Sequence, residues 1–311
     1  MHSVGRGLLD ARKDVTCDFV VEPDKYRLNK GIETADALIL RLTPLTANTI
    51  AKARQLKVVS RYGVGYDHVD VDALTAKGIP LAIVGDALST AVAEHTLLLM
   101  LAASRQTPVM DRLTRTGGYG ERFTRHYNDL LGRTLLLIGF GKIGRETATR
   151  CAAFGMNIIV AARSNKRADI ERAGYRHVED FHEALGEADY VSLHIPGMPD
   201  QSAVIGPAEF RQMKPGAYLI NTARGSLIDE DALHVALTKG TLRGAGLDVT
   251  RQEPPAPDCP LLKLESVVFS PHNAAFTDEA AQRVSAACVR NALAAIDGKL
   301  DPAFVVNRQV L

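Results

Sequence analysis

The chain has no tryptophan, few aromatic residues, four scattered cysteines and almost no excess of either charge. Lys and Arg number 37 against 36 acidic residues, and this net charge of +1 disfavours a surface for nucleic acid or other polyanions. Cys17, Cys151, Cys259 and Cys288 form no C-x-x-C pair and have no zinc-ligand spacing. They therefore predict free thiols in a reducing compartment and no metal site.

Long apolar runs are missing as well. The start, MHSVGRGLLDARKD, has no apolar core of a signal peptide, and the longest apolar stretch, residues 95–104, is shorter than the roughly 20 residues that span a bilayer. We therefore expect a cytoplasmic protein with no membrane partner, in which residues 95–104 belong to a buried helix. With 311 residues, of which 46% are apolar, the chain can form one large domain or two ordinary ones.

Short apolar runs alternate with helical patterns along almost the whole chain. This alternation predicts parallel sheets with helices on both faces. A long helical region over 89–116 separates two series of strands, so the sequence predicts two α/β domains, with a last helix over 277–297 that has Thr277 as its N-cap. The strands are expected at 15–21, 37–42, 58–61, 80–84, 134–138, 157–161, 190–195, 217–221, 244–249 and 267–270.

A glycine-rich turn, GFGKIG, follows the apolar run TLLLI directly. Gly139, Gly141 and Gly144 have G-x-G-x-x-G spacing, and a helical pattern and a second strand come next. In such a β-α-β unit the glycines allow a tight turn, backbone approach to a pyrophosphate and close packing of helix on strand. The turn therefore predicts a dinucleotide site, whereas a glycine-rich turn without a ligand is the alternative.

The end of the second strand indicates which dinucleotide binds. An NAD site usually has Asp or Glu there to bind the ribose, but this chain has Ala162, followed by Arg163 and Ser164. Arg can bind a 2′-phosphate with two parallel hydrogen bonds, and Ser can donate a hydroxyl. We therefore expect NADP(H) to be preferred over NAD(H), the alternative being surface cations without a ligand.

Three later stretches each follow a predicted strand, where open α/β sheets place their ligands. They are NTARGSLID with Arg224, GLDVTRQEPP with Asp248 and Glu253, and FSPHNAAF with His272. Each residue alone is more often structural than catalytic. Spacing alone leaves open whether the three stretches share one site.

Taken in order, GFGKIG, NTARGSLIDEDAL, GLDV…EP and SPHNAA resemble the D-isomer-specific 2-hydroxyacid dehydrogenase family, as do RYGVGYDHVD (61–70) and AVAEHTLLLMLA (91–102). The resemblance covers nearly the whole chain. It implies a flavodoxin-like substrate domain over 1–85 and 278–311 and a Rossmann dinucleotide-binding domain over 86–277, both doubly wound on parallel sheets. Relatives usually open with a strand, whereas a helical pattern at 4–12 comes first here, so we expect that strand to be missing or replaced.

The resemblance also implies the chemistry. Arg224 resembles the arginine that binds the carboxylate and carbonyl of a 2-oxo acid, His272 the acid/base, and Glu253 the carboxylate behind it. A hydride added to a ketone leaves an alkoxide, which an imidazolium can protonate, and a neighbouring carboxylate favours that charged imidazole. A guanidinium both anchors the substrate and polarises its carbonyl.

Further residues take their expected roles from the same resemblance. Asp248 is expected near the nicotinamide carboxamide, with Thr222 and Ala223 beside the ring. The amides of Val64 and Gly65 would hold the substrate carboxylate from the smaller domain, and domain closure would exclude water. Other cofactor contacts are expected from Phe140, Lys142, Ile143, His194 and Pro196.

The substrate itself is less defined. Arg61 resembles an arginine that lies near the substrate phosphate in phosphoglycerate dehydrogenases, and ARS (162–164) resembles the NADPH-preferring hydroxyphenylpyruvate and glyoxylate/hydroxypyruvate reductases. We rank an NADPH-linked reductase of glyoxylate, hydroxypyruvate or an aryl-pyruvate above an NAD-dependent phosphoglycerate dehydrogenase. A nucleotide-sensing, corepressor-like binding protein on the same fold is the alternative of another class. A homodimer formed through the 89–117 region is expected.

Overall fold

A computed structural model describes residues 1–20, 25–198 and 200–311 of the protein. The chain folds into two compact units, which we call unit 1 (residues 1–88 and 276–311) and unit 2 (residues 89–275). The boundaries at 85/86 and 277/278, and the roles assigned to the two domains, stay predictions. Within the described residues, no helix is long and apolar enough to cross a membrane.

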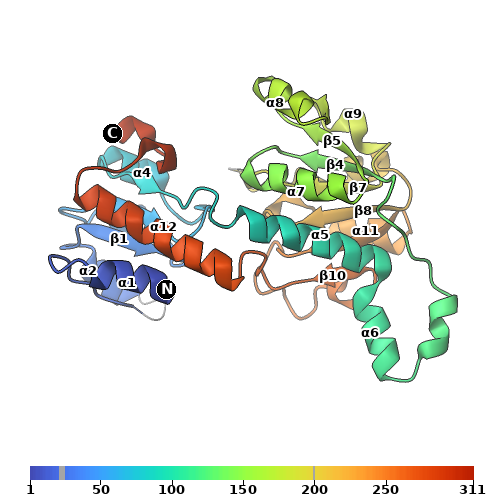
Figure 1. Ribbon diagram of the computed structural model, residues 1–311. Coiled ribbons are helices and arrows are strands. Elements are labelled where there is room, and N and C mark those ends of the chain that lie inside the picture. The colour runs from blue at the N-terminus through green and yellow to red at the C-terminus, as the bar shows by residue number, and fades with distance from the viewer. Residues whose placement is uncertain (21–24, 199) are drawn as a thin grey trace. The chain divides into compact units, whose positions relative to one another are not determined.

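Unit 1 contains a parallel sheet of three strands in the order β1-β2-β3. Helices α1 and α12 pack against each other, and α12 also packs on β1 and β2 (Figure 1). The N-cap of α12 is the predicted one, because the Thr277 hydroxyl accepts a hydrogen bond from the Ala280 amide at 3.1 Å. The elements are α1 (Ser3–Asp10), α2 (Lys25–Gly31), β1 (Ala37–Leu40), α3 (Ala47–Ile50), β2 (Val58–Arg61), α4 (Val71–Ala76), β3 (Leu81–Ala82) and α12 (Asp278–Ile296), with short 3₁₀ turns at Pro302–Phe304 and Arg308–Val310.

Unit 2 is built on a seven-stranded parallel sheet in the order β10-β9-β8-β7-β4-β5-β6. Chain order reverses between β4 and β7, the arrangement that leaves a ligand crevice at the carboxyl ends of a doubly wound sheet. The elements are α5 (Ser89–Arg105), α6 (Thr107–Arg115), β4 (Thr134–Ile138), α7 (Lys142–Ala153), β5 (Asn157–Ala161), α8 (Arg167–Arg172), β6 (Arg176–Val178), α9 (His182–Leu185), β7 (Tyr190–Leu193), α10 (Pro207–Gln212), β8 (Ala217–Asn221), α11 (Glu230–Thr238), β9 (Leu242–Leu247) and β10 (Val267–Phe269).

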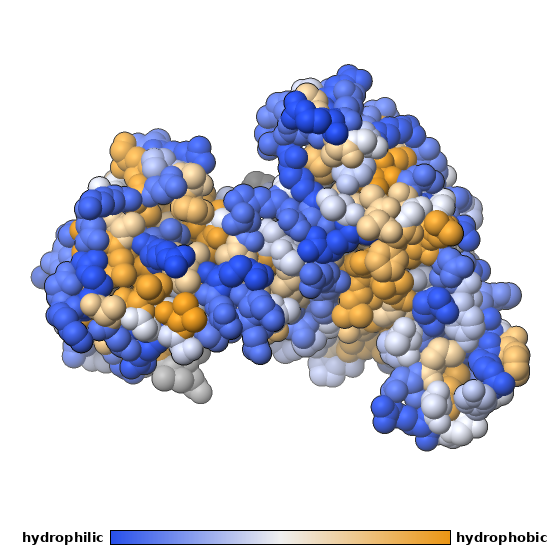
Figure 2. Space-filling view, viewed as in Figure 1, coloured by the Kyte–Doolittle hydropathy of each residue, from blue (hydrophilic) through white to orange (hydrophobic). Residues whose placement is uncertain are grey.

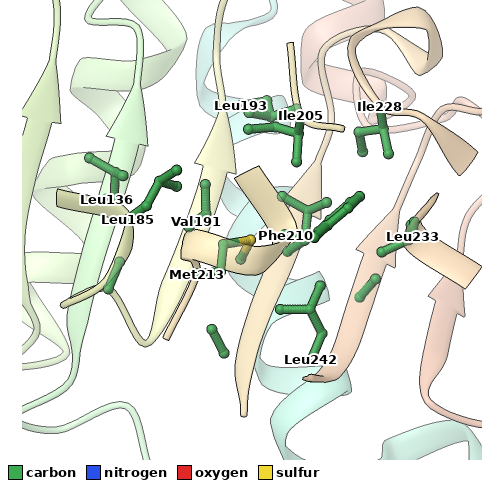
Figure 3. Close-up of a cluster of buried hydrophobic side chains, with 14 of the residues drawn as sticks. Leu136, Leu185, Val191, Leu193, Ile205, Phe210, Met213, Ile228, Leu233 and Leu242 are labelled. Carbon is green, nitrogen blue, oxygen red and sulfur yellow. The ribbon is translucent and has the colours of Figure 1, made fainter. Parts of the chain in front are cut away.

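Both faces of this sheet are covered by helices. The apolar sequence of β4 follows from this arrangement, because its side chains are buried on both faces. Leu136 and Ile138 face a core under α9, α10 and α11, part of which Figure 3 shows. Leu135 and Leu137 face the opposite core under α5, α7 and α8. Alternate side chains of one strand thus enter two different cores, which requires a continuous apolar run. The prediction of α/β domains on parallel sheets is confirmed.

Several strands are shorter than predicted, such as β1, β3 and β7, and three further details differ from the predicted elements. No strand forms over residues 15–20 of the predicted strand 15–21, and Val21 lies outside the described residues. The helical region over 89–116 is two helices, because Gln106 takes a left-handed conformation (φ 52°) between α5 and α6. Strand β6 was not predicted, since Arg176 and His177 give it no apolar run.

Candidate active site

The glycine-rich turn connects β4 to α7. Gly139 has a φ of 105°, and its amide donates to the Ala161 carbonyl at 2.9 Å. A Cβ at this position would collide with the His194 carbonyl, and a Cβ at Gly144 would collide with the Gly139 carbonyl. Gly141 is the N-cap of α7, and nothing would lie within 4 Å of a Cβ there. The turn is therefore fixed by close backbone packing and leaves open space at the start of the helix.

The side chains of this turn play different parts. Phe140 is buried, packs edge-to-face on Tyr175 with ring centroids 6.3 Å apart, and has the Arg145 guanidinium 4.4 Å from its ring. It is thus a core side chain, which leaves its backbone for any cofactor contact. Lys142 is exposed and Ile143 half-buried in the first turn of α7.

His194 and Pro196 follow β7, the neighbour of β4. The His194 amide donates to the Ile138 carbonyl at 2.8 Å, and its Nε2 lies 2.9 Å from the Ser192 hydroxyl. Burial lowers the pKa of His194 to about 4, so the imidazole is neutral at pH 7. Pro196 is exposed. His194 therefore borders the glycine turn without adding charge to it.

Arg163 and Ser164 stand exposed at the end of β5. The Arg163 guanidinium makes no hydrogen bond or ion pair with any residue that the structure describes. The nearby carboxylate of Asp169 is already engaged, since it binds Arg145 at 2.8 Å and Arg172 at 3.3 Å. Because β4 and β5 are adjacent and parallel, Arg163 lies on the same sheet edge as Gly139.

Arg224, Asp248 and His272 follow β8, β9 and β10 respectively, which are adjacent parallel strands. Their carboxyl ends meet at one edge of the sheet, so the three stretches singled out in the sequence come together in unit 2. The predicted acid/base, its carboxylate partner and the predicted substrate arginine all belong to this edge.

The loop after β8 is held by the buried side chain of Asn221. Asn221 Nδ2 donates to the Arg224 carbonyl at 2.8 Å, and its Oδ1 accepts from the Ala223 amide at 2.9 Å. The Arg224 guanidinium is half-buried and donates to the Ala223 carbonyl at 2.6 Å. Thr222 Oγ1 lies 2.9 Å from Thr96 Oγ1 of α5. Asn221 and Thr96 were not predicted to contribute.

At Gly225 this loop packs against the loop that follows β9. A Cβ at Gly225 would overlap the backbone of Thr250, so the two loops are in direct contact. The Asp248 amide donates to the Asn221 carbonyl at 2.9 Å, and the Thr250 amide donates to Glu253 Oε1 at 3.3 Å. The position of Glu253 is thereby tied to the loop that carries Arg224.

Asp248 is the most buried carboxylate of the site, with 2% of its surface exposed. Its Oδ1 accepts from the Ser270 hydroxyl at 2.6 Å and from the Asn273 amide at 3.0 Å, and its Oδ2 accepts from the Ala274 amide at 3.1 Å. These bonds satisfy a buried charge, as burial requires. They also show that Asp248 organises the segment around His272.

His272 has a left-handed backbone, with a φ of 51°, and its amide donates to the Asp248 carbonyl at 2.8 Å. Its Nδ1 lies 2.7 Å from Glu253 Oε2. This hydrogen bond raises the pKa of His272 above its usual value, although burial opposes the effect. Glu253 thus stabilises the imidazolium and leaves Nε2 available for proton transfer.

His95, which was not singled out in the sequence, also belongs to this edge. It lies on α5, 16% of its side chain is exposed, and its Nε2 is 2.7 Å from Ser270 Oγ and 3.5 Å from Asp248 Oδ1. A polar His-Thr pair inside the apolar stretch AVAEHTLLLMLA was the available sequence signal.

The predicted substrate residues of unit 1 lie at the end of β2, where Arg61 is the last residue of the strand, and in the loop that follows it. Arg61 is buried, and its Nη1 donates to the Tyr62 carbonyl at 2.7 Å. Val64 and Gly65 are half-buried, and their amides donate to no described residue. Within the described part of the chain, no group of His, Cys, Asp and Glu side chains is arranged to hold a metal ion.

Comparison with known proteins identifies the type of chain. The family model described as D-isomer specific 2-hydroxyacid dehydrogenase, NAD binding domain, matches residues 97–274. The chain is 38% identical over 306 residues to a glyoxylate reductase of Thermofilum pendens, covering 95% of this chain and 90% of the relative. Among solved structures, an acyclic imino acid reductase in complex with NADPH and D-Arg is 30% identical with a TM-score of 0.83, covering 91% of this chain and 89% of the other.

A second relative matches this chain over only part of its own length. A D-3-phosphoglycerate dehydrogenase of Methanocaldococcus jannaschii is 42% identical over 257 residues, which is 82% of this chain. The match covers 49% of that relative, so this chain spans about half of its length.

Proposed function

The chain belongs to the D-isomer-specific 2-hydroxyacid dehydrogenase family, and on that premise we propose that it reduces a small 2-oxo acid with NADPH. Family membership accounts for a nicotinamide cofactor and an oxidoreductase activity on 2-hydroxy or 2-oxo acids. The finer assignment rests on one observation above all: the His272–Glu253 pair at the sheet edge that also carries Arg224.

The residues at the ends of β4 and β5 fit the cofactor. Close backbone packing at Gly139 and Gly144 and open space at Gly141 suit a pyrophosphate. The exposed Arg163 and Ser164, with no acid at Ala162, suit a 2′-phosphate and favour NADP(H) over NAD(H). The remaining contacts are proposed as predicted, from Phe140, Lys142, Ile143, His194, Pro196, Thr222, Ala223 and Asp248.

The proposed mechanism needs one proton at one atom. When bound, the nicotinamide supplies a hydride to the C2 carbonyl carbon of the substrate. Arg224 binds the substrate carboxylate and carbonyl oxygen and stabilises the negative charge that develops there. His272 Nε2 then donates its proton to that oxygen, while Glu253 holds Nδ1 and stabilises the charged ring beforehand. In unit 1, the amides of Val64 and Gly65 are proposed to bind the substrate carboxylate.

The experiment that tests this function follows the loss of reduced nicotinamide. Purified protein is mixed with NADPH or NADH and with glyoxylate, hydroxypyruvate, pyruvate or hydroxyphenylpyruvate. We expect turnover of at least one 2-oxo acid, with a higher kcat/KM for NADPH. Tight nucleotide binding without turnover of any of them would instead favour the corepressor-like alternative.

A phosphorylated substrate is the second candidate. Its support is the 42% identity to a D-3-phosphoglycerate dehydrogenase and the Arg61 position. The same assay, run in the oxidation direction with 3-phosphoglycerate and NAD or NADP, decides between the two. Higher kcat/KM for 3-phosphoglycerate than for any unphosphorylated 2-hydroxy acid would select the second candidate.

We also propose that two copies of the chain pair through unit 2. Leu99, Met100 and Ala103 of α5 are buried in a core of unit 2, so the apolar sequence of this helix does not by itself require a partner chain. Leu98 of α5 is nevertheless 55% exposed, and Leu131 is 76% exposed. Apolar surface gathers on unit 2 beside α5 in the view of Figure 2. Exposed apolar area of this kind is typical of an interface.

A further inference from the structure

Helix α5 supports the loops of the site with two consecutive side chains. Thr96 Oγ1 lies 2.9 Å from Thr222 Oγ1, and His95 Nε2 lies 2.7 Å from Ser270 Oγ. Neither His95 nor Ser270 has a part in the mechanism proposed above, and both side chains are shielded from water more than His272 is.

The direction of the protons in this group follows from the chemistry of its members. The Asp248 carboxylate can only accept, and Ser270 Oγ lies 2.6 Å from its Oδ1. The single Ser270 hydroxyl proton is therefore used toward Asp248, and the Ser270 oxygen must accept from His95. His95 consequently carries a proton on Nε2, and the group forms a directed chain from His95 through Ser270 to Asp248.

A Ser-His-Asp set also invites a comparison with hydrolytic triads. In such a triad the serine gives its proton to the histidine, which the aspartate orients. Here the serine lies between the other two and donates to the aspartate. His95 is therefore not the base that a triad places beside its serine, and the bonds of this group serve to fix Asp248.

Fixing Asp248 has a consequence for the neighbouring imidazole. The Asp248 carboxylate accepts from the Asn273 and Ala274 amides, the two that follow His272, at 3.0 and 3.1 Å. The His272 backbone is left-handed, a conformation that an L residue keeps only when its surroundings hold it. The carboxylate of Asp248 therefore holds the turn at 272–274 in place, and this turn determines the orientation of the His272 side chain.

We propose that His95 is a positioning residue, which acts through Ser270 and Asp248 to hold the His272 turn in its reactive geometry. This inference rests on the proposed function of His272. It assigns to helix α5 a part in catalysis that is separate from packing. A misplacement of about 1 Å in a reacting group can reduce a rate roughly a hundredfold.

The test uses two amides that differ only in reach. In His95→Gln the amide nitrogen can lie near the position of Nε2 and still donate to Ser270, whereas in His95→Asn it lies near Nδ1 and cannot. We expect His95→Asn to lower kcat about tenfold or more, with the NADPH dissociation constant nearly unchanged, and His95→Gln to stay within about threefold of wild type. Equal kcat values for Asn and Gln would overturn the proposal.

Ser270→Ala breaks the same chain with a smaller change and serves if His95→Asn does not fold. We expect a comparable loss in kcat from it, and a double variant His95→Asn/Ser270→Ala that loses no more than the worse single variant. Losses that multiply would show that the two residues act independently. A loss confined to thermal stability or to NADPH binding would reduce both to structural residues.

A spectroscopic signature separates this inference from the proposed function. The ring Cε1–H resonance of His272, followed by NMR in protein with labelled histidine, should move in His95→Asn and Ser270→Ala but stay in place in His95→Gln. If wild-type protein turns over no 2-oxo acid, the proposed function fails. The NMR measurement still tests whether the hydrogen bonds from His95 through Ser270 to Asp248 position His272. An unmoved resonance in both breaking variants would overturn the inference alone.

Discussion

The two halves of one sheet edge in unit 2 are built in contrasting ways. At the ends of β4 and β5, the chain offers backbone and an exposed guanidinium that no described residue binds. At the ends of β8, β9 and β10, polar side chains hold one another: Asn221 fixes the Arg224 loop, Asp248 fixes the His272 turn, and Glu253 holds His272. Binding a phosphate tolerates a mobile cation, whereas proton transfer requires groups that are aligned in advance.

Removing the proton donor should give the largest effect, because it abolishes catalysis at one half of the sheet edge and leaves cofactor binding at the other half intact. His272→Ala is expected to lower kcat for 2-oxo acid reduction roughly a thousandfold, because general acid catalysis is lost, while the NADPH dissociation constant stays nearly unchanged. Steady-state kinetics and fluorescence titration measure the two. The exposed His126→Ala in the same unit is the control, and a His272→Ala variant that keeps most of its rate would remove His272 from the mechanism.

Weakening the imidazolium should give the next largest effect. The hydrogen bond from Glu253 raises the pKa of His272, so Glu253→Gln lowers it again. Reduction needs the protonated ring, and its rate falls as the pH rises through the His272 pKa. The basic limb of the kcat/KM profile should therefore move to lower pH in Glu253→Gln, with a rate loss of roughly tenfold to a hundredfold at neutral pH. An unmoved limb would show that another group titrates.

The exposed half of the edge should respond more mildly and only in cofactor choice. Arg163→Ala is expected to raise KM for NADPH roughly tenfold and to leave KM for NADH almost unchanged, because only NADPH carries the 2′-phosphate. The matched control is Arg172→Ala, another exposed arginine of the same segment. Equal changes for the two cofactors would show that Arg163 does not bind the phosphate.

The proposed pairing of two copies should have the smallest effect on chemistry. Leu98→Glu places a charge on an apolar surface of unit 2 and should shift the mass measured by light scattering from two chains toward one. The kcat should change less than threefold, because the site edge of unit 2 is built within one chain. Wild-type protein of single-chain mass would contradict the pairing itself.

The sequence was most informative where a strand is buried on both faces. The strands at 58–61, 134–138 and 217–221 match the predicted ones, and each contains a continuous apolar run, at 58–59, 135–138 and 217–220. The sequence was least informative where tertiary contacts determine the backbone conformation or the pairing of a strand. Gln106 breaks a helical pattern in a left-handed conformation, with Pro108 as the one local warning. Residues 15–20 read as a strand but pair with no neighbour in the described chain.

The site divides in the same way. Motif spacing placed Gly139, Arg224, Asp248, Glu253 and His272 at strand ends, and the strand order brings those ends together. Their chemical roles stay predictions. The Asn221 side chain binds Ala223 and Arg224 of its own loop, a local contact that the sequence analysis missed. His95, by contrast, contacts Ser270 in another loop, and Gly225 touches Thr250. Such contacts depend on the packing of β8, β9 and α5, which no local pattern specifies.

The left-handed backbone at His272 also makes the protein suitable for chemical complementation. Ala at this position keeps the strain of a φ of 51°, whereas Gly adopts that conformation freely and should give a variant more stable than His272→Ala by about 1 kcal/mol. The same Gly leaves a ring-sized vacancy beside Glu253, whose carboxylate can hold a small azole. Imidazole added to His272→Gly should then restore turnover in a concentration-dependent way. The activity of this variant would thus be controlled by a small molecule supplied from outside.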